Sequence, residues 1–195
     1  MKNTAQKFKY IALGLGGIIA LLIIWSFIEP RILNTETETA KIPNLPADWK
    51  GKQIAQITDF QIGLWGDNRG TASRSVAKIV EAKPAVALIS GDFLYHPGKN
   101  IKPEIITAVD IVRPLIKAGI PTYAVLGNHD YGMSSKKAPP KTAEAERLET
   151  VLETAGIEVL ENEAVKLRSP PNGRPLISSG IGSMNSLKRH KFYYV

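Results

Sequence analysis

After residue 50, apolar and polar residues alternate in a strand–helix rhythm. Short continuous apolar runs, typical of buried strands, alternate with longer segments in which apolar residues recur every three or four positions, as in helices. We predict strands at 53–58, 85–90, 121–127, 157–167 and 175–182, and helices at 72–83, 103–119 and 142–156. Strand–helix–strand units with continuously apolar strands predict an α/β fold with a mainly parallel sheet covered by helices.

The first part of the chain follows a different pattern. Residues 10–28 (YIALGLGGIIALLIIWSFI) carry no charge, and the run is close to the ~20 residues that cross a bilayer core. Lysines 2, 7 and 9 precede it, and no small-residue cleavage site follows. We predict an uncleaved signal anchor in the cell membrane, with the remainder of the chain outside the cytoplasm. A cleaved signal peptide and a buried core helix are the alternatives.

These patterns divide the chain into five segments. Residues 29–50 are a polar connector with three prolines, in which the TETETA alternation at 35–40 could pair as an edge strand. The five segments are a basic cytoplasmic N-terminus (1–9), the anchor (10–28), the connector (29–50), the α/β domain (51–182) and a basic tail (183–195).

The net charge of +7 lies mostly at the two ends. Residues 1–31 and residues 183–195 each carry +3, which leaves +1 for the whole middle of the chain. No basic stripe with interleaved aromatic residues crosses the domain, so we expect no nucleic-acid binding. The chain has no cysteine, which excludes a disulfide scaffold, a thiolate zinc site and a cysteine nucleophile.

Polar side chains follow three of the predicted strands. They are Asp59 and Gln61 in ITDFQ, Asp92 in ISGDF, and Asn128, His129 and Asp130 in LGNHD. In an open α/β sheet, ligands bind beyond the carboxyl ends of the strands, so these side chains should converge there. Oxygen ligands suit Mn²⁺, Mg²⁺, Fe²⁺ or Zn²⁺. Turn chemistry or helix capping explains each residue taken singly, whereas their succession after three buried strands favours a common site.

The motifs ITDFQIG, SGDF and LGNHDY resemble those of the calcineurin-like phosphoesterase (metallophosphoesterase) family. The order of anchor helix, EPR, polar connector and NLPADWKGKQIAQITD is similar to that of the membrane-anchored bacterial branch. The resemblance covers residues 28–182. It implies a four-layer α/β/β/α sandwich with a site for two divalent ions (Mn, Fe, Zn or Mg) and a phosphate-ester substrate.

The resemblance also implies a role for each residue. Asp59 would bind the first metal, Asp92 would bridge both, and Asn128 would bind the second through its carbonyl oxygen. His129 would stand beside the leaving group as general acid or electrostatic stabiliser. Asp130 would orient His129 by accepting its ring N–H.

Gln61 departs from the family pattern, which is Asp-x-His at this point. A glutamine carbonyl binds Mn²⁺ or Mg²⁺ but is a poorer ligand for Zn²⁺ than an imidazole. Binding through a water, or no binding at all, are the alternatives for Gln61.

The histidines depart further from the family. The family takes later ligands from a lone histidine and a Gly-His-x-His motif, whereas the histidines here are His96, His129 and His190. We therefore expect a chain truncated in the C-terminal half of the domain, with one apolar sheet face uncovered and little activity. A frameshift, a premature stop or a gene-model error would each produce such a tail.

Two histidines lie outside the motifs. His96 could approach the metals or the substrate, although a solvated loop histidine is more common. The tail around His190 (LKRHK) could contact anionic lipid or phosphate, although an unstructured charged end is more common.

Taken together, these features predict a membrane-anchored, metal-dependent phosphoesterase that hydrolyses phosphate esters. A non-catalytic truncated relative and a membrane-tethered interaction domain without metal are the alternatives.

Overall fold

The computed structural model describes residues 2–29, 32–64, 68–95, 101–133, 135, 138–167 and 176–180. The chain divides into two compact units, Met1–Glu36 and Thr37–Val195. The predicted tail at 183–195, His96 and His190 lie outside the described residues.

The first unit contains one long helix, α1 (Lys2–Ile28). Its segment Gln6–Ile28 has a mean hydropathy of 2.5 and no buried residues. The helix is thus long and apolar enough to cross a membrane. A signal sequence near the N-terminus would meet the same criteria, so the helix agrees with the predicted anchor without distinguishing it from a signal sequence.

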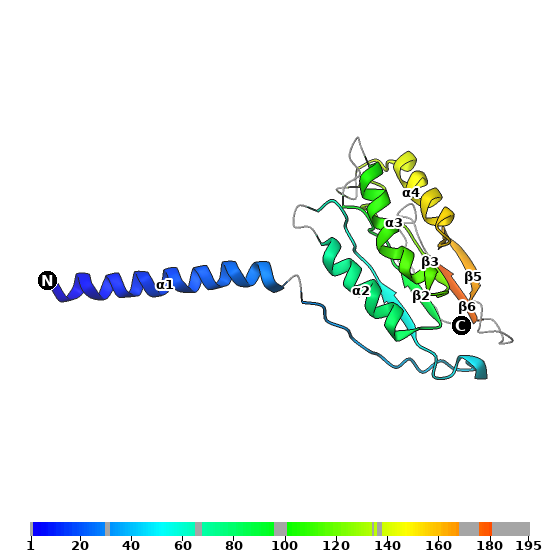
Figure 1. The fold of residues 1–195 in the computed structure, drawn as a ribbon, viewed down its shortest axis with the longest axis horizontal. Coiled ribbons are helices and arrows are strands. Elements are labelled where there is room, and N and C mark those ends of the chain that lie inside the picture. Colours follow the sequence, from blue (N-terminus) through cyan, green and yellow to red (C-terminus); the bar gives the residue numbers. More distant parts are fainter. Residues whose placement is uncertain are drawn as a thin grey trace. The chain divides into compact units, whose positions relative to one another are not determined.

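The second unit is built on a four-stranded parallel sheet of order β1-β2-β3-β4 (Figure 1). Its strands are β1 (Ile54–Ile57), β2 (Val86–Ile89), β3 (Thr122–Ala124) and β4 (Glu158–Val159). The intervening helices are α2 (Arg69–Ala82), α3 (Lys102–Lys117) and α4 (Thr142–Thr154). The mixed α/β fold with a parallel sheet, expected from the apolar pattern, is therefore confirmed.

One face of the sheet is covered by the helices, which lie side by side in Figure 1. Alternate residues of a strand point to opposite faces, and Ala87 and Ile89 of β2 face the helices. They belong to the main core with Val76 of α2, Val112 of α3 and Leu148 of α4. The periodic apolar positions of the helices thus form the core that their spacing predicts.

The opposite face carries a second, smaller core. A two-stranded antiparallel sheet of β5 (Glu163–Leu167) and β6 (Leu176–Gly180) follows β4. Trp49, in the short 3-10 helix η2 (Ala47–Trp49), and Leu167 are buried together with Val86 and Tyr123 of the parallel sheet. The expectation of an uncovered sheet face is therefore wrong for β2 and β3, while Ile54 of the edge strand β1 remains 38% exposed.

Two predicted strands differ in the structure. The segment 157–167 forms two strands in different sheets, because the chain turns between β4 and β5, where Asn162 adopts a left-handed φ of 52°. The TETETA segment at 35–40 forms no strand. It is exposed and is followed by Pro43 and Pro46, which cannot donate to a ladder.

Candidate active site

The loops after β1 and β2 run side by side and carry the first three predicted site residues. The backbone N–H of Asp59 donates to the carbonyl oxygen of Gly91 at 3.2 Å, and that of Gln61 donates to the carbonyl oxygen of Asp92 at 2.8 Å. The parallel pairing of β1 and β2 is thereby extended beyond the strand ends, as a single bridge between Ile62 and Leu94 also shows. This extension brings the two acidic motifs together.

The carboxylates of Asp59 and Asp92 lie close enough to interact directly. Burial raises the pKa of the half-buried Asp92, and the charge of Asp59 and a side-chain hydrogen bond with it raise the pKa further. A hydrogen bond from the backbone N–H of His129 and the charge of His129 both lower the pKa of Asp92. Gln61 reaches the same cluster, since its Nε2 donates to Asp59 Oδ1 at 3.4 Å. The side chains of Asp59, Gln61 and Asp92 are therefore together, with Gln61 approaching through its amide nitrogen rather than the oxygen expected to bind a metal.

The backbone at these three residues is in a region that side chains disfavour. The φ angles of Asp59, Gln61 and Asp92 are 58°, 44° and 57°, within the left-handed region. Residues held in this region cost free energy and cluster at functional sites. Backbone strain and adjacent like charges therefore occur together in the loops after β1 and β2, which makes these loops the candidate site.

The loops after β2 and β3 are packed against each other without space for further atoms. A Cβ at Gly91, whose φ is 92°, would lie 2.7 Å from the backbone nitrogen of Gly127. A Cβ at Gly127 would lie 2.2 Å from Oδ1 of Asp92. The glycine of SGDF and the glycine of LGNHD are therefore both required by this close approach.

The side chain of Asp130 links the loop after β2 to the loop after β3 through hydrogen bonds. Its side chain is 0% exposed, and its Oδ2 accepts the backbone N–H groups of Asp92 at 2.9 Å and Gly127 at 2.8 Å. Its Oδ1 accepts the N–H of Leu94 at 2.9 Å. Burial raises the pKa of Asp130 to about 7, although these hydrogen bonds lower it.

The contacts of Asp130 differ from the contact with the ring N–H of His129 that the resemblance implies. Both carboxylate oxygens of Asp130 bind backbone N–H groups. The ring Nδ1 of His129 instead lies 2.6 Å from the carbonyl oxygen of Tyr95. Tyr95 is a site residue that the motifs missed, because a backbone carbonyl leaves no trace in residue type.

The two remaining predicted residues lie in the loop after β3 and are half-buried. The backbone N–H of His129 donates to Oδ1 of Asp92 at 3.0 Å, which connects this loop to the acidic pair. The side chain of Asn128 donates from Nδ2 to the carbonyl oxygen of Met133 at 3.3 Å. That contact uses the amide nitrogen rather than the oxygen that the resemblance assigns to a metal.

The donor set fits part of a divalent-ion site. Among the described residues, no group of three or more histidine, aspartate or glutamate side chains is arranged to hold a metal ion. The described residues at the ends of β1 and β2 supply the two carboxylates of Asp59 and Asp92 and the amide of Gln61. Carboxylate and amide oxygens are hard donors, which suit Mn²⁺ or Mg²⁺.

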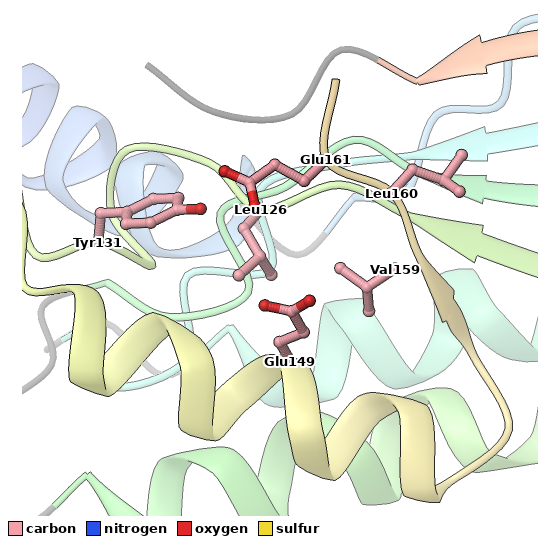
Figure 2. A pocket seen from close by; sticks show the side chains of 6 residues that line it. All are labelled: Leu126, Tyr131, Glu149, Val159, Leu160 and Glu161. Carbon is pink, nitrogen blue, oxygen red and sulfur yellow. The ribbon is translucent and has the colours of Figure 1, made fainter. Parts of the chain in front are cut away.

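A separate small pocket lies beneath the loop after β3 and contains none of the predicted site residues. It has about the room of one water molecule and is lined by Leu126, Tyr131, Glu149, Val159, Leu160 and Glu161. Figure 2 shows the Glu149 carboxylate rising from α4 toward Leu126. Burial, and then the charges of Glu161 and Glu149, raise the pKa of Tyr131.

Comparison with known proteins agrees with the motifs. The model of the calcineurin-like phosphoesterase family matches residues 52–187. Phosphodiesterase YaeI of Escherichia coli (strain K12) is 30% identical over 109 residues, which are 55% of this chain and 36% of that protein. The chain thus spans 36% of the length of this relative.

The crystal structure of phosphopantetheinyl hydrolase (PptH) from Mycobacterium tuberculosis aligns with a TM-score of 0.35 and 15% identity, over 64% of this chain and 40% of that chain. The family match extends over more than half of the sequence and includes the three loops described above. The chain therefore belongs to the calcineurin-like phosphoesterase family.

Proposed function

We propose that this chain provides the site of a membrane-anchored phosphoesterase that hydrolyses phosphate esters with two divalent metal ions. One observation carries the proposal. Asp59 and Asp92 lie in contact on left-handed backbone beyond the carboxyl ends of two parallel strands. Two adjacent carboxylates repel each other, and a bound cation removes that repulsion.

Four residues would hold the metal ions. Asp59 would bind the first ion, Asp92 would bind both, and Asn128 would bind the second through its amide oxygen. Gln61 would be a further ligand through its amide oxygen, since its amide nitrogen holds the side chain beside Asp59. When bound, divalent ions would neutralise charge on the phosphoryl oxygens and activate water for attack.

His129 would donate a proton to the departing oxygen of the ester. Its backbone is fixed to Asp92 and its ring to the carbonyl of Tyr95, so its position relative to the acidic pair is set before substrate binds. General acids act in this way only when held within hydrogen-bonding reach of the leaving group.

The anchor and the substrate class complete the proposal. The apolar helix α1 supports attachment to the cell membrane, with the domain outside the cytoplasm. The relative's name, phosphodiesterase, makes a phosphodiester the first substrate to test.

Metal binding tests the site directly. With the chain solubilised in detergent, equilibrium dialysis against Mn²⁺ should show that Asp92→Asn weakens binding at least about tenfold, or ~1.4 kcal/mol. His129→Ala should retain the metal. Asp110→Asn is the matched control, because Asp110 is 57% exposed on α3 and pairs with Arg113. Equal binding by Asp92→Asn and the unaltered chain would contradict the assignment.

Hydrolysis of a chromogenic phosphodiester in Mn²⁺ tests the activity. We expect slow, Mn²⁺-dependent turnover that Asp92→Asn abolishes and His129→Ala reduces. It should be slow because the described residues supply few of the ligands that two ions require. Background turnover by a chain that binds Mn²⁺ would instead identify a non-catalytic relative. Failure to bind any divalent ion would favour an interaction domain.

A further inference from the structure

The surroundings of His129 specify which of its ring nitrogens carries a hydrogen. Nδ1 lies 2.6 Å from the carbonyl oxygen of Tyr95. A carbonyl oxygen can only accept a hydrogen bond, so Nδ1 must be the donor. Neutral His129 is then the Nδ1–H tautomer, which leaves Nε2 as the ring nitrogen without a hydrogen.

The carbonyl of Tyr95 is itself held in place. The backbone N–H of Tyr95 donates to the carbonyl oxygen of Ile62 at 3.0 Å. The N–H of the preceding residue, Leu94, donates to the buried Asp130 at 2.9 Å. The carbonyl thus projects from a segment fixed to both the β1 loop and the β3 loop.

The side chain of Tyr95 contacts the same imidazole. The two rings are stacked, with centroids 5.4 Å apart and planes inclined by 16°. A stacked neighbour restricts rotation of the imidazole, and thereby keeps Nδ1 directed at the carbonyl. One residue therefore restrains both the edge and a face of His129.

We infer that Tyr95 is a positioning residue for His129: its carbonyl fixes the Nδ1–H tautomer, and its ring holds the imidazole so that Nε2 delivers the proton. The inference rests on the proposed function for the identity of the reaction. The tautomer itself can be measured in a chain that shows no turnover, so failure of the inference and failure of the proposed function are distinguishable.

The experiment is ¹H–¹⁵N correlation spectroscopy of the imidazole nitrogens in the full chain, without metal, at pH 8. The chain has three histidines, and comparison with His129→Ala identifies the signals of His129. We expect a protonated Nδ1 and an unprotonated Nε2. A predominance of the Nε2–H tautomer would overturn the inference, since histidine so protonated cannot donate to the carbonyl.

Variants test the contribution of the Tyr95 ring. Tyr95→Ala keeps the carbonyl but loses the stacking, and should yield a mixture of tautomers. Tyr95→Phe keeps the ring and should restore the tautomer of the unaltered chain. Tyr95→Leu, of more similar size, serves if Tyr95→Ala fails to fold. A full Nδ1–H population in the folded Ala or Leu variant would show that the ring positions nothing.

Discussion

At the scale of single residues, the sequence motifs identify side chains better than they identify partners. Asp59, Gln61 and Asp92 come together as their places after β1 and β2 predict. The surroundings of Asp130 and His129 could not be predicted, because both depend on backbone groups. Every residue except proline carries the same backbone N–H and C=O, so residue type does not reveal which of these groups a side chain will meet.

The contact between Gly127 and Asp92 leads to a prediction about stability. In Gly127→Ala the added methyl group would lie 2.2 Å from Oδ1 and 2.7 Å from the backbone nitrogen of Asp92. The loops must then separate, at a cost of about 1–3 kcal/mol. We expect chemical denaturation to show this loss and dialysis to show weaker Mn²⁺ binding.

Gly70→Ala is the matched control for this variant. Gly70 lies in α2, where a Cβ would meet Arg74 at an ordinary 3.5 Å. Alanine is the better helix former, so this variant should be at least as stable as the unaltered chain. Equal stability of Gly127→Ala and the unaltered chain would mean that the loops after β2 and β3 can accommodate a methyl group.

At the scale of helices and strands, periodicity located each predicted helix within a few residues. The predicted helix at 72–83 is α2, that at 103–119 is α3 and that at 142–156 is α4. The strand predicted at 157–167 was wrong because apolar alternation does not show with which strand a segment pairs. Because the chain turns at Asn162, β4 pairs with β3 and β5 pairs with β6.

The packing of α4 near β4 predicts a pH dependence of stability. Burial, followed by the charges of Glu153 and Glu161, raises the pKa of Glu149 above 4.5. The folded chain therefore holds this proton more tightly than the unfolded chain does. The resulting stabilisation is complete below about pH 4.5 and is lost as pH rises through the folded pKa.

The variant Glu149→Gln checks that dependence. It should unfold at a higher temperature than the unaltered chain at pH 7–8, but at no higher temperature at pH 4. Glu81→Gln, at an exposed position of α2, controls for the general loss of one charge. A gain that is the same at both pH values would assign the effect to something other than the carboxylate.

At the scale of the whole molecule, the parallel sheet and its helical cover could be predicted, whereas the cover of the opposite face could not. That face is buried by Trp49 and Leu167, which lie far apart in the sequence. Leu167 belongs to a strand whose pattern also fitted the parallel sheet. Contacts over such separations depend on topology, which local patterns do not specify.

Membrane topology is testable on the complete chain. The lysines before the apolar helix α1 predict a cytoplasmic N-terminus. A reporter that is active only in the cytoplasm, fused after Val195, should therefore be silent. The same fusion without residues 10–28 should be active, which controls for a reporter that is disabled by its fusion partner. Strong signal from the complete fusion would contradict the predicted orientation.

The buried carboxylate of Asp130 has a consequence for how the loops open. It accepts the amide hydrogens of Asp92, Leu94 and Gly127, which belong to two loops. Solvent can reach those hydrogens only when the carboxylate is displaced, so hydrogen–deuterium exchange should occur at all three with one common opening free energy. Widely different protection among them would show that the loops open separately. Coupled exchange means that neither loop can adopt a new conformation by itself.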